Sequence, residues 1–571
     1  MRWPLPAALL LLLAALPLLG AAVLSLSALF DANAWRALWQ DPQGPRALAL
    51  SVWTALASTI LAWWATRSLL AQGFVQRRLA RVLRGLPPML ATPHAAFAIG
   101  LVFLLAPSGW VLRAVSPWLT GLGSPPSWPT TQDPWGLGLI AALALKETPF
   151  LLWTAATQLQ RDDVRRRWRA EHDLAQTLGY APRRAFDLVV WPQLAPRLIG
   201  PLVAVLAYGL TVVDMALVIG PASPPTLAVL AWQWLQDADP AANAQGAAAG
   251  GVLALAVAVS VGLWRLVPAR AALRARLDTG ARGPLAAASR CGRWWGGALL
   301  IAVYGAVFAA LALGSVAGVW PFPDLWPETL STRAWASVWD GRVTVLTTLG
   351  LAAASAALAL AWSVAWLETA PRRWNAGLRP LLYLPLVTPA VLWVVGLYGA
   401  ALWLRIEGRW SALLAAHTLM ALPYVLLALE PAYLGFDPRH RAVSSSLGHG
   451  RARFLLLVKW PLLRRALAAS AAVGFAVSVA QYLPTLYLGA GRWSTVTTEA
   501  VSLAAGGQRS LTSAYAGLQF ALPLLGFALA AWVGRPRRFA ATSPEAADGG
   551  TGDPARARAG PARAGVPGST P

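Results

Sequence analysis

Long apolar runs alternate with short polar segments along the whole chain. About 20 apolar residues are needed to cross a bilayer as an α-helix, and twelve runs come near that length. They lie at 5–30, 47–66, 86–105, 135–156, 198–220 and 247–264 in the first half, and at 295–320, 343–366, 381–404, 410–429, 466–489 and 514–533 in the second. This pattern predicts an all-α integral membrane protein with about twelve transmembrane helices.

Basic residues concentrate in every second loop between these runs. Loops 77–84, 161–184 and 439–459 are rich in Arg, whereas the loop 221–245 has no Lys or Arg. Cytoplasmic loops carry the excess of Lys and Arg, so an even number of spans with both termini in the cytoplasm fits the pattern. It also favours a retained first helix over a cleaved signal peptide.

Composition agrees with a membrane protein and narrows the function. The chain is 57% hydrophobic and 12% charged, with a net charge of +23. The basic residues sit in short separate loops, which disfavours nucleic-acid binding, because that needs one continuous basic face. Cys291 is the single cysteine, so no intrachain disulfide and no cluster of thiolate metal ligands is expected.

The two halves repeat one another. Thr92 recurs as Thr388 at an offset of 296, and Gly220 recurs as Gly489 at an offset of 269. The difference lies in the external loop 106–134, which is much shorter in the second half. Duplicated halves predict a path at their interface. The expected domains are 1–268, a cytoplasmic linker 269–294, 295–534, and a disordered tail 535–571 whose composition cannot form a core.

One Arg-rich loop in each half, 161–197 and 433–465, carries the same motif. A Leu-Gly pair ends at Gly179 or Gly448, and a proline, Pro192 or Pro461, follows thirteen residues after the glycine. We expect a short helix, a tight turn at the glycine, and a second amphipathic helix that the proline ends. An apolar face shared by both helices would contain Leu174, Leu178, Phe186 and Val190.

Such a hairpin would lie at the cytoplasmic surface, because it is too short and too charged to cross the membrane. An interfacial hairpin that only anchors the bundle or contacts anionic lipid is the alternative. The same thirteen-residue spacing in both halves favours a shared partner over simple anchoring.

The motif resembles the EAA loop of binding-protein-dependent ABC importer permeases, over both membrane halves. The fusion of two halves is similar to that of the ferric-iron and thiamine permeases, and segments 213–226 and 481–491 look like those of YnjC-type fused permeases. The resemblance implies a bacterial inner-membrane protein, two coupling helices docked on a cytoplasmic ABC ATPase dimer, and a periplasmic solute-binding protein. ATP would then be used by the partner, with no cofactor bound by this chain.

The resemblance also implies which residues couple to the ATPase. In the first loop they are Asp173, Ala175, Leu178, Gly179 and Pro192, and in the second Ala442, Ser444, Leu447, Gly448 and Pro461. The family's glutamate is Asp173 in the first loop, whereas Ala442 carries no acid in the second. We therefore expect two ATPase contacts that are not equivalent.

An ionisable residue inside a span usually faces a cavity or a partner, because burying it in lipid is costly. Asp214 lies in the fifth span, and Gln481 and Tyr482 lie near the repeat-equivalent position of the eleventh. These three residues are candidates for the translocation path, and a cationic solute such as thiamine or a metal species is compatible with Asp214. The alternative is that Asp214 caps a broken helix. Isolated His94 and His417 are expected to be satisfied within the bundle.

No P-loop, HExxH motif or paired His/Cys spacing is present in the sequence, so we expect neither catalysis nor a metal centre in this chain. Two other functions remain open. A secondary transporter driven by an ion gradient would not need two matched cytoplasmic loops. A polytopic membrane enzyme would need clustered carboxylates or histidines on one face, and the external loops hold only scattered acids.

Overall fold

The computed structural model is built from helices throughout the part of the chain that it describes. Described are residues 5–76, 79–160, 162–266, 295–371, 374, 377, 379–386 and 388–535. The predicted linker 269–294 and the predicted tail after 535 lie outside them. An isolated antiparallel bridge joins Ala317 to Leu330, in a segment between two helices. The chain divides into unit 1–534, which holds the helices, and unit 535–571.

The first half begins with apolar helices separated by short polar breaks. Their bounds are α1 (Leu5–Leu29), α2 (Ala32–Gln40), α3 (Gly44–Val75), α4 (Leu79–Ala91), α5 (His94–Leu105), α6 (Trp110–Val115) and α7 (Leu137–Gln160). It continues with α8 (Asp162–Thr177), α9 (Pro182–Ala185), η1 (Phe186–Val190), α10 (Trp191–Leu194), η2 (Ala195–Leu198), α11 (Ile199–Thr211), α12 (Asp214–Ile219), α13 (Leu227–Leu235) and α14 (Pro240–Leu266).

The second half repeats this order. Its elements are α17 (Trp295–Val316), α18 (Arg333–Asp340), α19 (Arg342–Thr369), α21 (Arg379–Leu382), η3 (Leu384–Leu386), α22 (Ala390–Trp403), α23 (Trp410–Leu434), α24 (Arg439–Ser446), α25 (Arg451–Phe454), η4 (Leu455–Lys459), α26 (Trp460–Ala480), α27 (Leu483–Gly489), α28 (Val496–Ala505) and α29 (Arg509–Val533).

The apolar helices confirm an all-α membrane fold. Among the described residues, ten helical stretches are long and apolar enough to cross a membrane, and two shorter apolar helices, Leu5–Gly20 and Ala390–Trp403, accompany them. Together, these twelve helical stretches give one helix for each of the twelve apolar runs in the sequence. Short helices α13 and α28, which hydropathy did not predict, occupy equivalent positions 269 residues apart.

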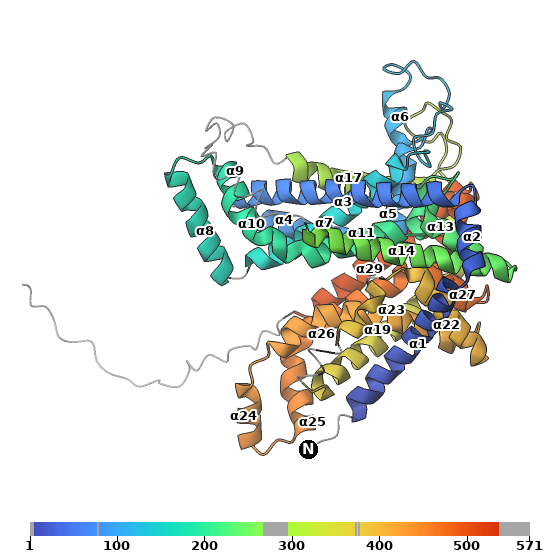
Figure 1. Ribbon diagram of the computed structural model, residues 1–571. Coiled ribbons are helices and arrows are strands. Elements are labelled where there is room, and N and C mark those ends of the chain that lie inside the picture. Colours follow the sequence, from blue (N-terminus) through green and yellow to red (C-terminus); the bar gives the residue numbers. More distant parts are fainter. Residues whose placement is uncertain are drawn as a thin grey trace, which may run out of the picture. The chain divides into compact units, whose positions relative to one another are not determined.

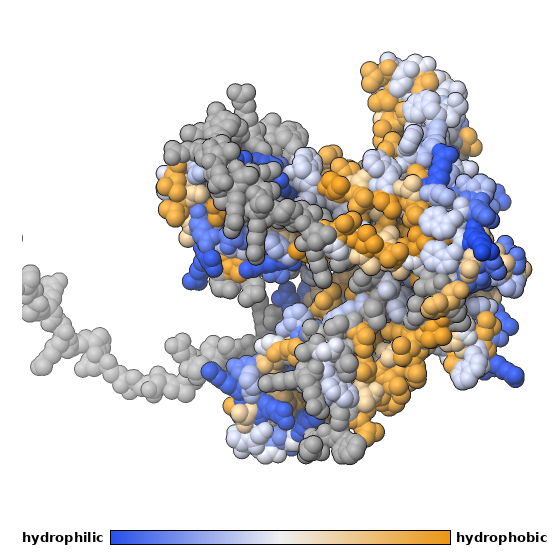
Figure 2. All heavy atoms as spheres, in the orientation of Figure 1, coloured by the Kyte–Doolittle hydropathy of each residue, from blue (hydrophilic) through white to orange (hydrophobic). Residues whose placement is uncertain are grey.

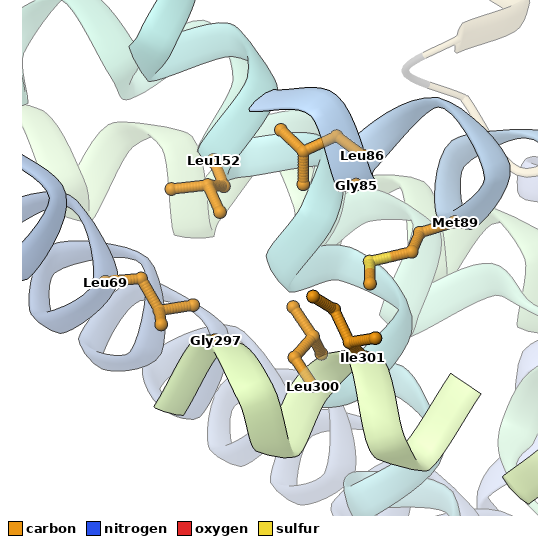
Figure 3. Close-up of a pocket in the computed structure, with 8 residues that line it drawn as sticks. All are labelled: Leu69, Gly85, Leu86, Met89, Leu152, Gly297, Leu300 and Ile301. Atoms are coloured by element: carbon orange, nitrogen blue, oxygen red, sulfur yellow. The ribbon is translucent and has the colours of Figure 1, made fainter. Parts of the chain in front are cut away.

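The first helix of each half packs against the other half. Helix α1 contacts α22 and α19 of the second half, and α17 contacts α5 of the first. Helix α17 also covers a small apolar cavity of ≈ 10 Å³ over α3, α4 and α7, lined by side chains such as Leu69, Leu152 and Leu300 (Figure 3). A cavity of that size holds about one water molecule. Because the first helix of each half packs against the other half, close apolar contacts hold the two halves together.

Within residues 1–534, the loops that carry the repeated motif lie at one end of the bundle. Figure 1 shows α8, α9, α24 and α25 at that end, and α2, α13 and α27 at the opposite end. In Figure 2, hydrophobic surface covers the middle of the helices and hydrophilic surface gathers near both ends. This is the distribution that a bilayer requires of a spanning bundle.

Candidate coupling site

The Leu-Gly pair of each loop closes a helix in the same way. Gly179 and Gly448 have positive φ values of 86° and 75°, a left-handed conformation that glycine adopts without steric cost. The next residue in each loop donates its backbone N–H to a carbonyl five residues back: Tyr180 to Ala175 at 3.1 Å and His449 to Ser444 at 3.1 Å. Both helices thus end in the same Schellman-type turn, which explains why glycine stands there.

The hairpins expose equivalent apolar side chains. Leu174 and Leu178 of the first are 61% and 58% exposed, and the residues 269 positions later, Val443 and Leu447, are 60% and 67% exposed. The small residues Ala175 and Ser444 are buried. In each hairpin, the helix before the glycine is the first arm and the helix after it is the second arm. Each hairpin therefore presents two apolar side chains that the described residues leave exposed.

The predicted apolar face shared by both arms is wrong. Phe186 and Val190 are fully buried, whereas Leu174 and Leu178 point outward. The apolar periodicity within each arm was predicted correctly. The turn between the arms, however, directs Leu174 and Leu178 of the first arm away from the bundle. The mismatch leaves an apolar surface free for contact with another molecule.

The prediction that Pro192 and Pro461 end the second arm is also wrong. The helical path runs from Pro182 to Thr211 and from Arg451 to Ala480. A π-helical turn precedes each proline, in which Trp191 donates its N–H to Phe186 and Trp460 to Leu455. The wider turn relieves the clash that a proline ring makes with an α-helical carbonyl. The second arm is thus continuous with a membrane span, a rigid connection between hairpin and bundle.

Internal contacts brace the first hairpin. Gln193 Nε2 donates to Glu171 Oε2 at 2.7 Å, and Arg167 Nε donates to Glu171 Oε1 at 2.8 Å. The hydrogen bonds from Arg167 and then Gln193 lower the pKa of Glu171 below its usual value. Arg67 of α3 forms an ion pair with Asp187 at 2.9 Å. These contacts join both arms to each other and to α3.

The acidic position differs between the hairpins, as the sequence shows. The carboxylate of Asp173 is 56% exposed and lies 3.4 Å from the ring of His172. It is therefore accessible beside the exposed apolar pair, while Ala442 supplies no charge at the equivalent place. Whether Asp173 contacts a partner stays a prediction.

Two spans break at equivalent positions deep in the bundle. Helix α11 ends before Val212, and helix α26 ends before Gln481. Val212 and Gln481 both have extended backbone conformations. Asp214 then begins α12, directly after the N-cap residue Val213. Tyr482 lies close enough to Asp214 to interact electrostatically. The path role of Asp214, Gln481 and Tyr482 and the capping alternative for Asp214 both stay predictions.

Both histidines in the spans have partners, as predicted. His94 Nε2 lies 3.0 Å from Glu147 Oε1. His417 is hydrogen bonded to Ser478 and Thr485, at 2.9 and 3.0 Å. Across the described part of the chain, no group of three or more His, Cys, Asp or Glu side chains could hold a metal ion.

A larger cavity lies where the two halves meet. Its volume is ≈ 300 Å³, and its lining comes from α5 and α12 of the first half and from the α28–α29 turn of the second. The loop after α5 adds Ser108, Thr131 and Gln132, and α29 adds Arg509 and Thr512, so the wall is partly polar and partly apolar. The cavity is of the size of a small-molecule site, at the interface that the sequence repeat predicts for a path.

Comparison with known proteins identifies the class of protein that this fold defines. No protein-family model matches the chain. The chain is 35% identical over 537 residues to the inner membrane ABC transporter permease protein YnjC of Escherichia coli, covering 91% of this chain and 95% of that protein. It is 27% identical over 214 residues to the molybdenum transport system permease protein ModB of Mycobacterium tuberculosis, covering 35% of this chain and 78% of ModB.

The chain therefore belongs to the family of inner-membrane ABC transporter permeases. It is a multi-pass membrane protein whose function is that of the permease subunit of an ABC importer. The relatives are permeases rather than enzymes.

Proposed function

We propose that the two hairpins, 161–197 and 433–465, dock on two cytoplasmic ATPase subunits, which hydrolyse the ATP. One observation carries the proposal: the same glycine turn and the same exposed apolar pair recur 269 residues apart, at one end of the bundle (Figure 1). Exposed apolar side chains at a helix end favour a protein contact. Two matched surfaces on one face fit a partner with two matched grooves.

The continuous second arm supports a mechanical role. Since the helical path runs without a break from Pro182 to Thr211, a displacement of the hairpin would move the end of α11 beside Asp214. The same holds from Arg451 to Ala480, next to Gln481. Closure of the ATPase subunits would therefore reach the broken segments of both halves, as a rigid-body switch between inward-open and outward-open states.

We place the translocation path at the interface of the halves, with Asp214, Gln481 and Tyr482 as lining candidates. A periplasmic solute-binding protein would deliver the solute to the end opposite the hairpins, and both chain termini would be cytoplasmic. The electrostatic interaction between Asp214 of the first half and Tyr482 of the second supports this placement. The interface cavity of ≈ 300 Å³ is a separate space that none of the three candidates lines.

Site-specific cross-linking tests the docking. In a Cys291→Ser background, Thr177→Cys and Ser446→Cys place thiols at equivalent exposed positions of the two hairpins. The chain is co-expressed with the ATPase encoded beside it, and a photoactivatable thiol reagent is attached. We expect both positions to cross-link to the ATPase, and Ser337→Cys, exposed on α18, to give no product. Labelling of the ATPase from Ser337→Cys alone, or from none of the three, would contradict the proposal.

A further inference from the structure

A partly buried acid at the end of α19 holds the second hairpin to the bundle. Glu368 has a side chain that is 16% exposed, and Lys459 Nζ donates to its Oε1 at 2.6 Å. Arg451 Nη2 donates to Oε2 at 3.1 Å and to the backbone oxygen of Glu368 at 2.7 Å. Arg451 begins α25 and Lys459 ends η4, so the two residues lie at either end of the first part of the second arm. One carboxylate thus binds that arm at two points.

Helix α23 joins the same network. Tyr433 Oη donates to Glu368 Oε1 at 2.8 Å, and Trp460 Nε1 donates to Tyr433 Oη at 3.2 Å. The ammonium of Lys459 also lies 3.8 Å from the centre of the Tyr433 ring. The network therefore links α19, α23 and the hairpin through charge-assisted bonds, which are stronger than neutral ones.

The described residues of the first half form no equivalent of this network. At the repeat offsets, Gln72 stands for Glu368, Pro182 for Arg451 and Val190 for Lys459. Within the described residues, Oε1 of Gln72 is buried without a hydrogen-bond partner. The first hairpin is held instead by the Arg67–Asp187 pair. The two hairpins are thus attached by different groups at different places.

We propose that Glu368 is the positioning residue through which α19 and α23 follow the second hairpin when the ATPase moves it. The inference rests on the proposed docking of the hairpins, and it adds the residue that carries the motion into the second half. Glu368 lies in the last turn of the long span α19, where the charged groups of the hairpin reach that helix. In the first half, the Arg67–Asp187 pair links the hairpin to α3 at a different place.

Loss of the carboxylate would leave Lys459 and Arg451 without their anion. A buried charge that loses its partner is costly, whereas removal of both partners is often tolerated. Glu368→Gln should therefore weaken the attachment of the hairpin to the end of α19. Glu368→Gln combined with Lys459→Met should be no worse than Glu368→Gln alone, since the double change leaves no unpaired ammonium.

Two pairs of spin labels measure the motion without knowledge of the solute. The hairpin pair is Thr177→Cys with Ser446→Cys. The body pair is Trp64→Cys on α3 with Leu358→Cys on α19, both exposed positions. Labels are introduced in the Cys291→Ser background, in complex with the ATPase, and distances are recorded by pulsed spin resonance with and without ATP. In the complex with the wild-type Glu368 network, we expect ATP to change both the hairpin-pair and the body-pair distances.

In the Glu368→Gln complex we expect the hairpin pair to shift as before and the body pair to lose its shift. Asp340→Asn, which removes an exposed carboxylate at the other end of the same half, should leave both shifts intact. An unchanged body shift in Glu368→Gln would overturn the inference. If Glu368→Gln does not assemble, the Glu368→Gln, Lys459→Met double variant replaces it, and an unchanged body shift there is equally decisive. A wild-type complex whose hairpin pair ignores ATP would instead overturn the proposed function.

Discussion

Gly448 offers the clearest test of the turn that closes the second hairpin. A Cβ added there meets no atom within 4 Å, so Gly448→Ala introduces no clash and only the backbone conformation matters. At φ 75°, an L-residue other than glycine costs about 1–2 kcal/mol. That strain lowers the population of the native turn by about 5- to 30-fold relative to glycine.

Gly448→Pro should be more severe than Gly448→Ala. Proline fixes φ near −65°, which is incompatible with the turn, and it removes the backbone N–H that Gly448 donates to Ser445 at 3.0 Å. We expect a loss of about 3 kcal/mol or more. Asparagine, which tolerates the left-handed region better than alanine, should fall between glycine and alanine.

The assay is the affinity of the detergent-purified chain for its ATPase subunit, together with the ATP-driven shift of the hairpin labels. Affinity should fall in the order Gly, Asn, Ala, Pro, while the amount of chain in the membrane stays constant. Gly450→Ala is the matched control, because Gly450 is two residues away, has a φ of −67° and also has no atom within 4 Å of an added Cβ. Wild-type affinity and response in Gly448→Pro would refute this account of the turn.

Three further predictions concern the docking surface, the path and the first hairpin. Leu178→Asp and Leu447→Asp each place a charge in the exposed apolar pair, and each should weaken ATPase binding by about tenfold or more, measured by co-purification; equal binding would contradict the docking surface. Asp214→Asn should leave ATPase binding unchanged and reduce uptake of the solute that the binding protein retains; unchanged uptake would assign Asp214 to helix capping. Hydrogen bonds lower the pKa of Glu171 in the folded state, so they stabilise the hairpin at pH values above the usual carboxyl pKa. That stabilisation is lost as the pH falls through the lowered pKa. Protection factors for amide exchange in α8, which correct for the slower intrinsic exchange in acid, should fall on acidification in the wild-type chain but not in Glu171→Gln.

Much of the fold was predictable because it depends on local pattern. Apolar runs of span length give the helices, and the Leu-Gly pair predicts a turn at Gly179 that the structure confirms. Hydropathy could not predict the helices α13 and α28, because their short apolar stretches are interrupted by polar loops. It also could not place the break at Val212, which lies inside a continuous apolar run.

The candidate site was predicted in part. Position and spacing located both hairpins, yet the side-chain exposure of Leu174 required knowledge of what the first arm packs against. Glu368 was missed, because an acid in the last turn of an apolar span looks like a helix end. A usable signal exists: an acid at the end of a span, facing a basic loop on the same side, predicts an ion pair such as that with Lys459.

The sequence by itself determined the membrane class, the duplication and the two glycine turns, since each follows from composition or from contacts between near neighbours in the chain. The tertiary structure decided the rest. Pro192 does not end its helix, because a π-helical turn accommodates the ring. Glu368 meets Lys459 across 91 residues, and such a pairing depends on how α19, α23 and α26 pack rather than on any local pattern.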